Sequence, residues 1–408
     1  MLQSIAIIGA GQAGFQVAAS LRQEGYTGHL ALIGDEPGLP YQRPPLSKAY
    51  MLGKTDAAGL LFRPQKFFDD HDIAMVSGRA AAINRTNRHV AMADGRTIAY
   101  DHLVLALGAH NRLLPVPGAT RDGVFGLRTL ADAAAVSQRL ADARNVVVCG
   151  AGFIGLEFAA VARAQGCTVH VLELADRPMA RAVSAETSAC FREAHEARGV
   201  RFDFGEGLSH VEGHDGRVTG VVTTSGTTLP ADLVMVGIGV LPSVAIAAEA
   251  GLDIDNGVKV DSDLLTSDPA ISAIGDCASF PSRHADGRVR LDSVQNAADQ
   301  ARCVAARLMG KPQPYAALPW FWSDQGDMRL QIAGLSHGTD VTVVVGDRVG
   351  RQFSVLRFRD DQLLAVESVN RPGDHMAARK LLVRMPSLTP REAAVDGFDL
   401  RGFEVASR

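Results

Sequence analysis

The sequence has no long hydrophobic run, no basic leader and no excess of positive charge. No apolar stretch among its 408 residues reaches the roughly 18 residues of a membrane span, and its start lacks the basic segment of a signal peptide. The formal net charge of −4 argues against a nucleic-acid partner, because phosphate backbones bind surplus lysine and arginine. We therefore expect a cytoplasmic globular protein with neither a membrane nor a nucleic-acid partner.

Cysteine is scarce and scattered. The five cysteines form no C-x-x-C pair and no metal-ligand spacing, and none precedes residue 149. We expect reduced thiols in the core and no metal site. The five are Cys149, Cys167, Cys190, Cys277 and Cys303.

A glycine pattern near the start lies between an apolar run and a helical segment. Residues 5–8 are typical of a strand, and the alanine-rich residues up to 21 favour a helix. Gly9 permits a tight turn, Gly11 lets a pyrophosphate approach the backbone, and Gly14 lets the helix lie close to the strand. This order of strand, G-x-G-x-x-G and helix predicts a dinucleotide site at the helix N-terminus.

An acidic pair follows the next expected strand, residues 29–34. Asp35 and Glu36 lie roughly 20 residues beyond the glycines, where a carboxylate can bind ribose hydroxyls. An acidic surface loop would have the same sequence, but the glycine pattern upstream favours the ribose contact.

Residues 39–51, LPYQRPPLSKAYM, are stiffened by Pro44 and Pro45. We expect a helix to start near Ser47 as its N-cap. This rigid turn could aim Arg43 and Lys48 at a cofactor, or it could be a loop with solvated charges. The residues alone leave both interpretations open.

The whole unit recurs about 140 residues later. A strand at 145–149 precedes Gly150, Gly152 and Gly155, a helix is expected over 156–165, and a strand at 168–172 ends at Glu173. Two complete units are a far stronger signal than one, and they predict two bound dinucleotides in an α/β protein with two Rossmann-type domains.

Three charged residues bear on the second dinucleotide. Glu173 can bind both ribose hydroxyls of NAD and repel a 2′-phosphate, which favours NADH over NADPH. Arg177 could meet such a phosphate, but its place before Pro178 favours a solvated loop charge. Glu157 could face the nicotinamide or simply favour the start of its helix, and the residues do not decide between these roles.

The remaining segments complete the expected fold. Hairpins are expected within 76–98, a buried strand at 103–107, further strands at 218–224 and 231–236, and a short strand at 271–274 that ends at Gly275-Asp276. A helix is expected over 294–309. From Trp320 onward, strands at 329–333, 341–345, 351–358 and 363–369 and a helix over about 374–385 indicate a small α+β domain.

The chain resembles the FAD-dependent, NADH-utilising ferredoxin reductases of oxygenase systems, within the glutathione-reductase-like superfamily. The resemblance covers the whole chain and is carried by GAGQAG, IGDE, YQRPPLSKAY, LALGA, GAGFIGLE, VLEL, GIGVLP, AIGDCA and PWFWSDQ. It implies an FAD domain at residues 1–110 and 243–319, an NADH domain at 111–242, and a C-terminal α+β domain at 320–408 that covers the flavin.

The resemblance also implies roles for single residues. Lys48 beside the isoalloxazine and Glu157 beside the nicotinamide are expected to be catalytic. The residues implied to contact FAD are Gly9, Gly11, Ala13, Gly14, Asp35, Arg43, Lys48, Ala81, Arg128, Asp276, Val294 and Trp320. Those implied to contact NADH are Gly150, Gly152, Ile154, Gly155, Glu157, Glu173 and Gly239.

The implied activity splits an electron pair. NADH would reduce FAD, and reduced FAD would give single electrons to a [2Fe–2S] ferredoxin that serves a cytochrome P450 or a Rieske-type oxygenase. We expect a monomer or weak dimer that docks the acidic ferredoxin through basic side chains. The candidates are Arg63, Lys311, Arg379, Lys380 and Arg384, although these charges could also be merely solvated.

Three other activities are known for proteins with two such dinucleotide units. Disulfide reductases and NADH oxidases or peroxidases place their redox cysteine in the region where this chain has Arg43–Lys48, and no cysteine occurs between Met1 and Val148. A non-catalytic NADH-sensing flavoprotein resembling apoptosis-inducing factor is disfavoured by the lack of targeting or basic tail segments.

Overall fold

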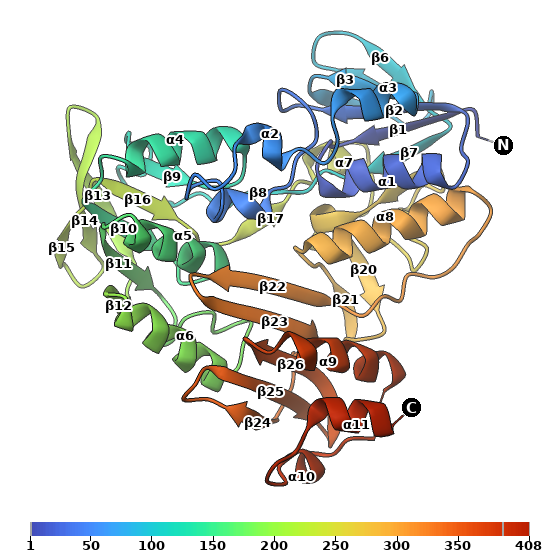
Figure 1. Cartoon of the computed structure of the whole chain (residues 1–408). Coiled ribbons are helices and arrows are strands. Elements are labelled where there is room, and N and C mark those ends of the chain that lie inside the picture. The colour runs from blue at the N-terminus through green and yellow to red at the C-terminus, as the bar shows by residue number, and fades with distance from the viewer. Residues whose placement is uncertain (1, 386, 408) are drawn as a thin grey trace. The chain divides into compact units, whose positions relative to one another are not determined.

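The computed structural model describes residues 2–385 and 387–407, which form two compact units (Figure 1). The first unit combines Met1–Gln42, Ala58–His110 and Leu241–Pro319, and the second combines Arg43–Ala57, Asn111–Val240 and Trp320–Arg408. In these described stretches, no helix is long and apolar enough to cross a membrane.

The first unit is built on a five-stranded parallel sheet in the order β19-β7-β1-β2-β3. Ile8 of β1 lies beside Ile33 of β2 and Leu105 of β7, so both neighbours of the first strand run parallel to it. Helices α1 and α8 lie side by side against the sheet (Figure 1). The bounds are β1 Ser4–Ile8, α1 Gln12–Gln23, β2 His29–Gly34, β3 Ile73–Ser77, β7 His102–Leu105, β19 Ile271–Ala273 and α8 Val294–Leu308.

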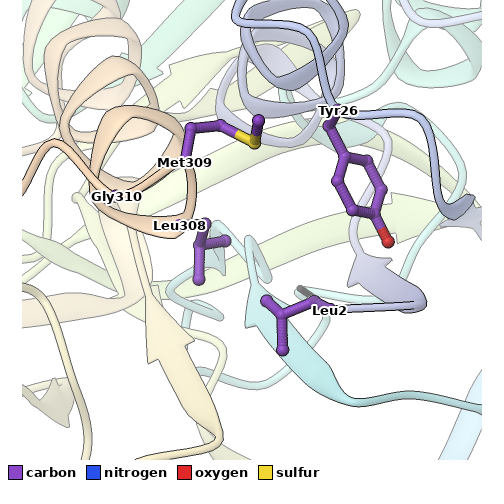
Figure 2. A pocket seen from close by; sticks show the side chains of 5 residues that line it. All are labelled: Leu2, Tyr26, Leu308, Met309 and Gly310. Carbon is purple, nitrogen blue, oxygen red and sulfur yellow. The ribbon is translucent and has the colours of Figure 1, made fainter.

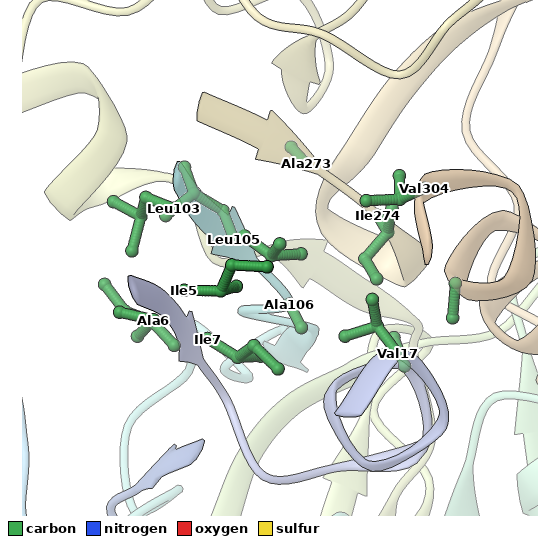
Figure 3. Close-up of a cluster of buried hydrophobic side chains, with 14 of the residues drawn as sticks. Ile5, Ala6, Ile7, Val17, Leu103, Leu105, Ala106, Ala273, Ile274 and Val304 are labelled. Atoms are coloured by element: carbon green, nitrogen blue, oxygen red, sulfur yellow. The ribbon is translucent and has the colours of Figure 1, made fainter. Parts of the chain in front are cut away.

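The core of this unit fills the space between the sheet and these two helices (Figure 3). Ile7 of β1, Val17 of α1 and Val304 of α8 are each fully buried there, beside Leu105 and Ile274. A strand buried on both faces has a continuous apolar sequence, which is why residues 5–8 and 103–107 were predictable as strands.

Smaller elements complete the first unit. Strands β4 Ala80–Asn84, β5 His89–Met92 and β6 Thr97–Ala99 form the expected hairpins. Their turns contain Asn87-Arg88 and Asp94-Gly95, with Arg88 and Gly95 at positive φ. The others are α3 Gln65–Asp70, α7 Ala245–Glu249, β18 Val258–Lys259, η2 Gly275–Cys277, β20 Ala278–Ser282 and β21 Gly287–Val289; α2 Ala57–Leu60, β8 Ala109–Asn111 and β17 Val240–Pro242 lie at the unit boundaries.

The second unit repeats the architecture with a parallel sheet in the order β12-β11-β10-β16-β9. Cys149 of β10 lies beside Leu172 of β11 and Val236 of β16, as Ile8 lies between its neighbours in the first unit. The bounds are β9 Val124–Gly126, α4 Leu130–Leu140, β10 Asn145–Cys149, α5 Phe153–Ala164, β11 Thr168–Glu173, α6 Ala185–Ala197, β12 Val200–Phe204, β13 Leu208–His214, β14 Arg217–Thr223, β15 Thr228–Pro230 and β16 Leu233–Val236.

The same unit includes a five-stranded antiparallel sheet in the order β22-β23-β26-β25-β24, with α9 packed on β26 and β23. This confirms the expected α+β character from Trp320 onward, and β22 adds a strand that was not predicted. The bounds are β22 Trp320–Gln325, β23 Met328–Gly334, β24 Val341–Asp347, β25 Gln352–Arg359, β26 Gln362–Val369, α9 Pro372–Arg384, α10 Pro390–Ala393 and α11 Leu400–Ala406.

The expected helix starting at Ser47 is wrong. A short 3-10 helix, η1 Pro44–Ser47, ends there instead, with Lys48 as its C-cap. The two prolines suit the first turn of a helix because that turn needs no N–H donors. The Lys48 N–H donates to the Pro45 carbonyl, which closes the tight turn, and turns follow instead of a longer helix.

Candidate functional site

The first glycine loop has the geometry of a dinucleotide cradle. Gly9 has a φ of +108°, and a Cβ there would collide with the Ala106 carbonyl oxygen, while a Cβ at Gly14 would collide with the Gly9 carbonyl. Gly11 differs, because a Cβ there would meet nothing within 4 Å. Gly11 is also the N-cap of α1 and has no capping side chain, so the first turn is left with N–H donors for an anion.

Other parts of the first unit meet at this loop. A Cβ at Gly275, next to Asp276, would lie 3.2 Å from the Ala13 Cβ and 3.7 Å from that of Ala297. The loop, η2 and the start of α8 at Val294 therefore lie together, and the Ser293 hydroxyl caps α8. Asp35 and Ala81 are exposed residues at the end of β2 and on β4.

The second glycine loop repeats the first in the second unit. Gly150 has a φ of +98°, and its Cβ would lie 2.6 Å from the Gly237 carbonyl oxygen. Gly155 has no room for a Cβ against the Gly150 carbonyl, whereas at Gly152 the nearest atom would be 3.8 Å away. Gly152 is likewise an N-cap without a side-chain cap. Two further contact residues were expected for this loop. Ile154 lies on α5 and is 45% exposed, and Gly239 lies just before β17 with a φ of +103°.

Glu173 reaches the second loop from the end of β11. Its Oε2 accepts from the Ala151 N–H at 2.7 Å and its Oε1 from the Ala175 N–H at 2.9 Å. The equivalent place on β2 is Gly34, where a Cβ would lie only 2.7 Å from that of Ala10. The two copies therefore differ at this strand end, and the first copy has its acid one residue later, at Asp35.

Arg177 is not a solvated charge. Its guanidinium donates to the carbonyls of Ala180, Val183 and Ser184 at 2.9, 3.0 and 3.3 Å, respectively. These bonds fix the loop before α6 and engage the guanidinium, so it is not directed at a 2′-phosphate. The expectation that Arg177 is a solvated loop charge is therefore wrong, because its guanidinium binds backbone carbonyls of its own loop.

A buried carboxylate joins η1, α5 and β22. Glu157, 3% exposed, accepts from the Lys48 ammonium at 2.8 Å and the Ser47 hydroxyl at 2.5 Å through Oε2. Its Oε1 accepts from the Ser323 hydroxyl at 2.7 Å. The sequence analysis did not predict that either serine contacts Glu157. The only available signal was the alternation of WFWSDQ, which in a strand places Phe321, Ser323 and Gln325 on one face.

The other expected flavin contacts of this unit lie near η1 and on β22. The Arg43 guanidinium donates to the Arg128 carbonyl at 2.6 Å, which ties η1 to the residue before the capping box of α4. Trp320 is the first residue of β22. The Arg379 guanidinium lies 4.5 Å from the centroid of the Trp320 ring, and the His375 ring lies 5.7 Å from it.

Burial raises the pKa of all five thiols. Burial raises the pKa of Cys149 to about 12 and that of Cys277 to about 11, so both stay protonated at neutral pH. Cys277, beside Asp276, is fully buried and donates to the Ile274 carbonyl. All five cysteines are free, as expected, and only Cys303 is not fully buried.

One pocket of about 300 Å³ lies away from these features in the first unit (Figure 2). Leu2, before β1, and Tyr26, after α1, line it together with Leu308, Met309 and Gly310 at the end of α8. It therefore lies at the amino end of β1, whereas the glycine loop lies at the carboxyl end, where ligands of parallel sheets bind.

Two glycine loops with uncapped helix N-termini, each at the carboxyl end of a parallel sheet, fit two dinucleotides. A buried carboxylate with an ammonium partner, Glu157 and Lys48, accompanies them. Fold and site thus define the class of α/β proteins that bind two dinucleotides on two Rossmann-type sheets.

Comparisons with known proteins define the family. Residues 3–301 match the family model "Pyridine nucleotide-disulphide oxidoreductase", and residues 320–403 match "Reductase C-terminal". Rhodocoxin reductase of Rhodococcus erythropolis is 51% identical over 399 residues, covering 98% of this chain and 93% of that protein. The chain belongs to the pyridine nucleotide-disulphide oxidoreductase family and to its ferredoxin reductases, which confirms the resemblance, the fold class and the use of FAD and NAD(H).

Solved structures agree with this assignment. The ferredoxin reductase for the CYP199A2 system from Rhodopseudomonas palustris aligns with a TM-score of 0.97 at 52% identity, covering 100% of both chains. The reductase in the covalent putidaredoxin reductase–putidaredoxin complex aligns with a TM-score of 0.96 at 38% identity, covering 99% of both.

Proposed function

We propose that this reductase takes electrons from NADH and passes them singly to a [2Fe–2S] ferredoxin that serves an oxygenase. The absence of any cysteine before residue 149, in a chain with two dinucleotide loops, carries the proposal, because disulfide reductases and NADH oxidases need a redox cysteine in the region where this chain has Arg43–Lys48. Bound FAD supplies the conversion between two-electron and one-electron chemistry. The protein supplies binding, orientation and charge.

We assign FAD to the loop at residues 9–14 and NADH to the loop at residues 150–155. In the first unit, Asp35, Ala81, Asp276 and Val294 join the FAD loop. In the second unit, Arg43, Lys48, Arg128 and Trp320 complete the FAD contacts, while Ile154, Glu157, Glu173 and Gly239 complete those of NADH. This assignment divides the chain into FAD residues 1–110 and 243–319, NADH residues 111–242 and a C-terminal domain from 320.

Lys48 and Glu157 set the charge of the site. The Lys48 side chain is 21% exposed and that of Glu157 only 2%, so the cation is the more accessible member of the pair. In a site from which water is excluded, this fixed ammonium stabilises negative charge far better than it would in bulk solvent. Following the family resemblance, we assign Lys48 to the isoalloxazine and Glu157 to the nicotinamide.

An anaerobic titration with NADH tests the function. We expect NADH to bleach the visible absorbance of bound FAD and an added [2Fe–2S] ferredoxin to restore it within the assay mixing time. Fast restoration by oxygen or by a disulfide, with none by ferredoxin, would overturn the proposal.

Glu173 should determine nicotinamide preference. Glu173→Ala removes the ribose acceptor and is expected to lower the NADH-over-NADPH ratio of kcat/KM about 30-fold, the equivalent of roughly 2 kcal/mol for hydrogen bonds to a charged group. Steady-state kinetics with both nucleotides measures the ratio.

The matched variant Glu173→Gln separates charge from positioning. Its amide oxygen can still accept from the Ala151 N–H, but the negative charge is gone. We expect it to improve use of NADPH while losing less activity with NADH than Glu173→Ala. An unchanged ratio in both variants would show that Glu173 does not select the nucleotide.

The exposed side of α9 is the best supported of the docking candidates. Lys311 is paired with Glu24 at 2.7 Å, Arg384 with Glu404 at 2.8 Å, and Arg63 lies over the Phe67 ring. Arg379 lies over the Trp320 ring in the same way. Lys380 remains, exposed on α9 between Met376 and Val383, which are each 50% exposed. A face with an exposed cation between apolar side chains suits an acidic protein partner.

Lys380→Glu should therefore weaken ferredoxin binding. We expect the KM for ferredoxin to rise about 5-fold at low salt and the difference to shrink as salt screens the charges, with reduction of FAD by NADH unchanged. The control is Lys66→Glu, the same charge change on exposed α3. Equal effects of both variants would indicate overall charge rather than a docking site.

We also propose that the protein acts in the cytoplasm as a monomer or weak dimer. Size-exclusion chromatography with light scattering tests the oligomeric state directly.

A further inference from the structure

The Ser323 hydroxyl that donates to Glu157 belongs to a longer buried chain of hydrogen bonds. Ser323 Oγ accepts from the Gln325 side-chain amide at 3.2 Å, and the Gln325 carbonyl oxygen lies 2.9 Å from His195 Nε2. Ser323, Gln325 and His195 are all fully buried, and Glu157 is 3% exposed. This series of hydrogen bonds links α6, β22 and α5 entirely within the second unit.

The direction of this chain follows from its donors and acceptors. An ionised carboxylate only accepts, so Ser323 donates its hydroxyl to Glu157 and must accept from the amide of Gln325. The Gln325 carbonyl then faces His195, which has to donate from Nε2. Burial lowers the pKa of His195 to about 4, so its ring is neutral at physiological pH and Nδ1 carries no proton.

Neighbouring groups hold the intermediate members in place. The Gln325 amide also contacts the Met179 sulfur at 3.6 Å, and the Phe202 ring meets the His195 ring edge to face at 6.2 Å between centroids. Phe321, on the same face of β22, packs on Phe153 of α5 with ring centroids 4.5 Å apart. A polar chain enclosed in this way has few alternative arrangements.

We propose that Ser323, Gln325 and His195 are positioning residues that set the orientation of the Glu157 carboxylate. Lys48 and Ser47 bind one carboxylate oxygen, and the Ser323 chain binds the other, so together they fix the rotation of the carboxylate plane. This inference rests on the proposed function, because it gives Glu157 its role at the nicotinamide. A group that has to meet a substrate at a defined angle loses efficiency when its support is removed.

The test replaces the residues of this hydrogen-bond series one at a time in the FAD-loaded protein. We expect Ser323→Ala to slow reduction of FAD by NADH about 10-fold with little change in the dissociation constant of NADH, and Gln325→Leu and His195→Phe to have progressively smaller effects. The matched control is Ser354→Ala. Ser354 is a fully buried serine in the same antiparallel sheet that donates to Asp374 at 3.0 Å, away from Glu157.

A spectroscopic measurement separates positioning from general loosening. The carboxylate band of Glu157, identified with Glu157→Gln in electrochemically induced reduced-minus-oxidised infrared spectra, should shift in Ser323→Ala and not in Ser354→Ala. An unshifted band with a wild-type reduction rate, or equal slowing in both serine variants, would overturn the proposal. Ferredoxin reduction by the wild-type protein tests the proposed function separately, since this infrared comparison requires neither NADH nor ferredoxin.

Discussion

We expect the Glu157→Gln variant to be reduced by NADH about 100-fold more slowly than the wild-type protein while keeping its FAD. The carboxylate accepts from Lys48, Ser47 and Ser323. In a glutamine, one of the two oxygens is replaced by an NH2 group, which cannot accept the hydrogen bonds made on that side. Lys48 would also lose the negative charge 2.8 Å from its ammonium. Stopped-flow absorbance of the flavin measures the rate, and the flavin content of the purified protein verifies that FAD is bound.

The chain offers a matched control in Glu367, a second buried carboxylate of the same unit. Glu367 is fully buried and accepts from the Ser184 hydroxyl and the Arg357 guanidinium, each at 2.8 Å. Breaking this buried pair with Glu367→Gln should lower the free energy of unfolding by roughly 3 kcal/mol. The folded holoprotein should still be reduced by NADH within about 2-fold of the wild-type rate. If both variants were slowed alike, loss of a buried charge rather than the place of Glu157 would explain the effect.

The repeated parallel sheets were predictable because their signals are local. Strand β10 matched its expected bounds, and β1 began one residue early, since buried parallel strands have continuous apolar sequences. The first and third glycines of both loops follow from backbone collisions, and the third collides with the carbonyl of the first within the loop itself. Such constraints are written into short stretches of sequence, so they could be recognised without the fold.

The surroundings of Glu157 were not predictable in this way. Its partners Ser47 and Ser323 lie 110 and 166 residues away in sequence, and only the packing of η1 and β22 on α5 brings them together. His195 was missed because α6 was not predicted, although Ser184 and Glu186 have the residue types that favour a helix start. Long-range polar contacts depend on tertiary packing, which local residue preferences do not encode.

The assignment of FAD to the first loop and NADH to the second has a sharp test in two equivalent glycines. Gly11 and Gly152 are both helix N-caps with extended backbones, and neither has an atom within 3.5 Å of the place where a Cβ would lie. Valine at either position should therefore fold, but its side chain would occupy the space through which a pyrophosphate approaches the backbone. We expect Gly11→Val to purify with less than about a tenth of the wild-type FAD.

The same substitution in the second loop should give the opposite result. Gly152→Val should retain FAD and lose NADH affinity by at least about 10-fold, measured as the NADH concentration needed to bleach the flavin. Gly14→Val is the folding control, since a Cβ there collides with the Gly9 carbonyl oxygen and should prevent soluble expression. Loss of FAD from Gly152→Val with retention in Gly11→Val would reverse the assignment. Retention of both nucleotides in both variants would mean that the loops do not bind the pyrophosphates at all.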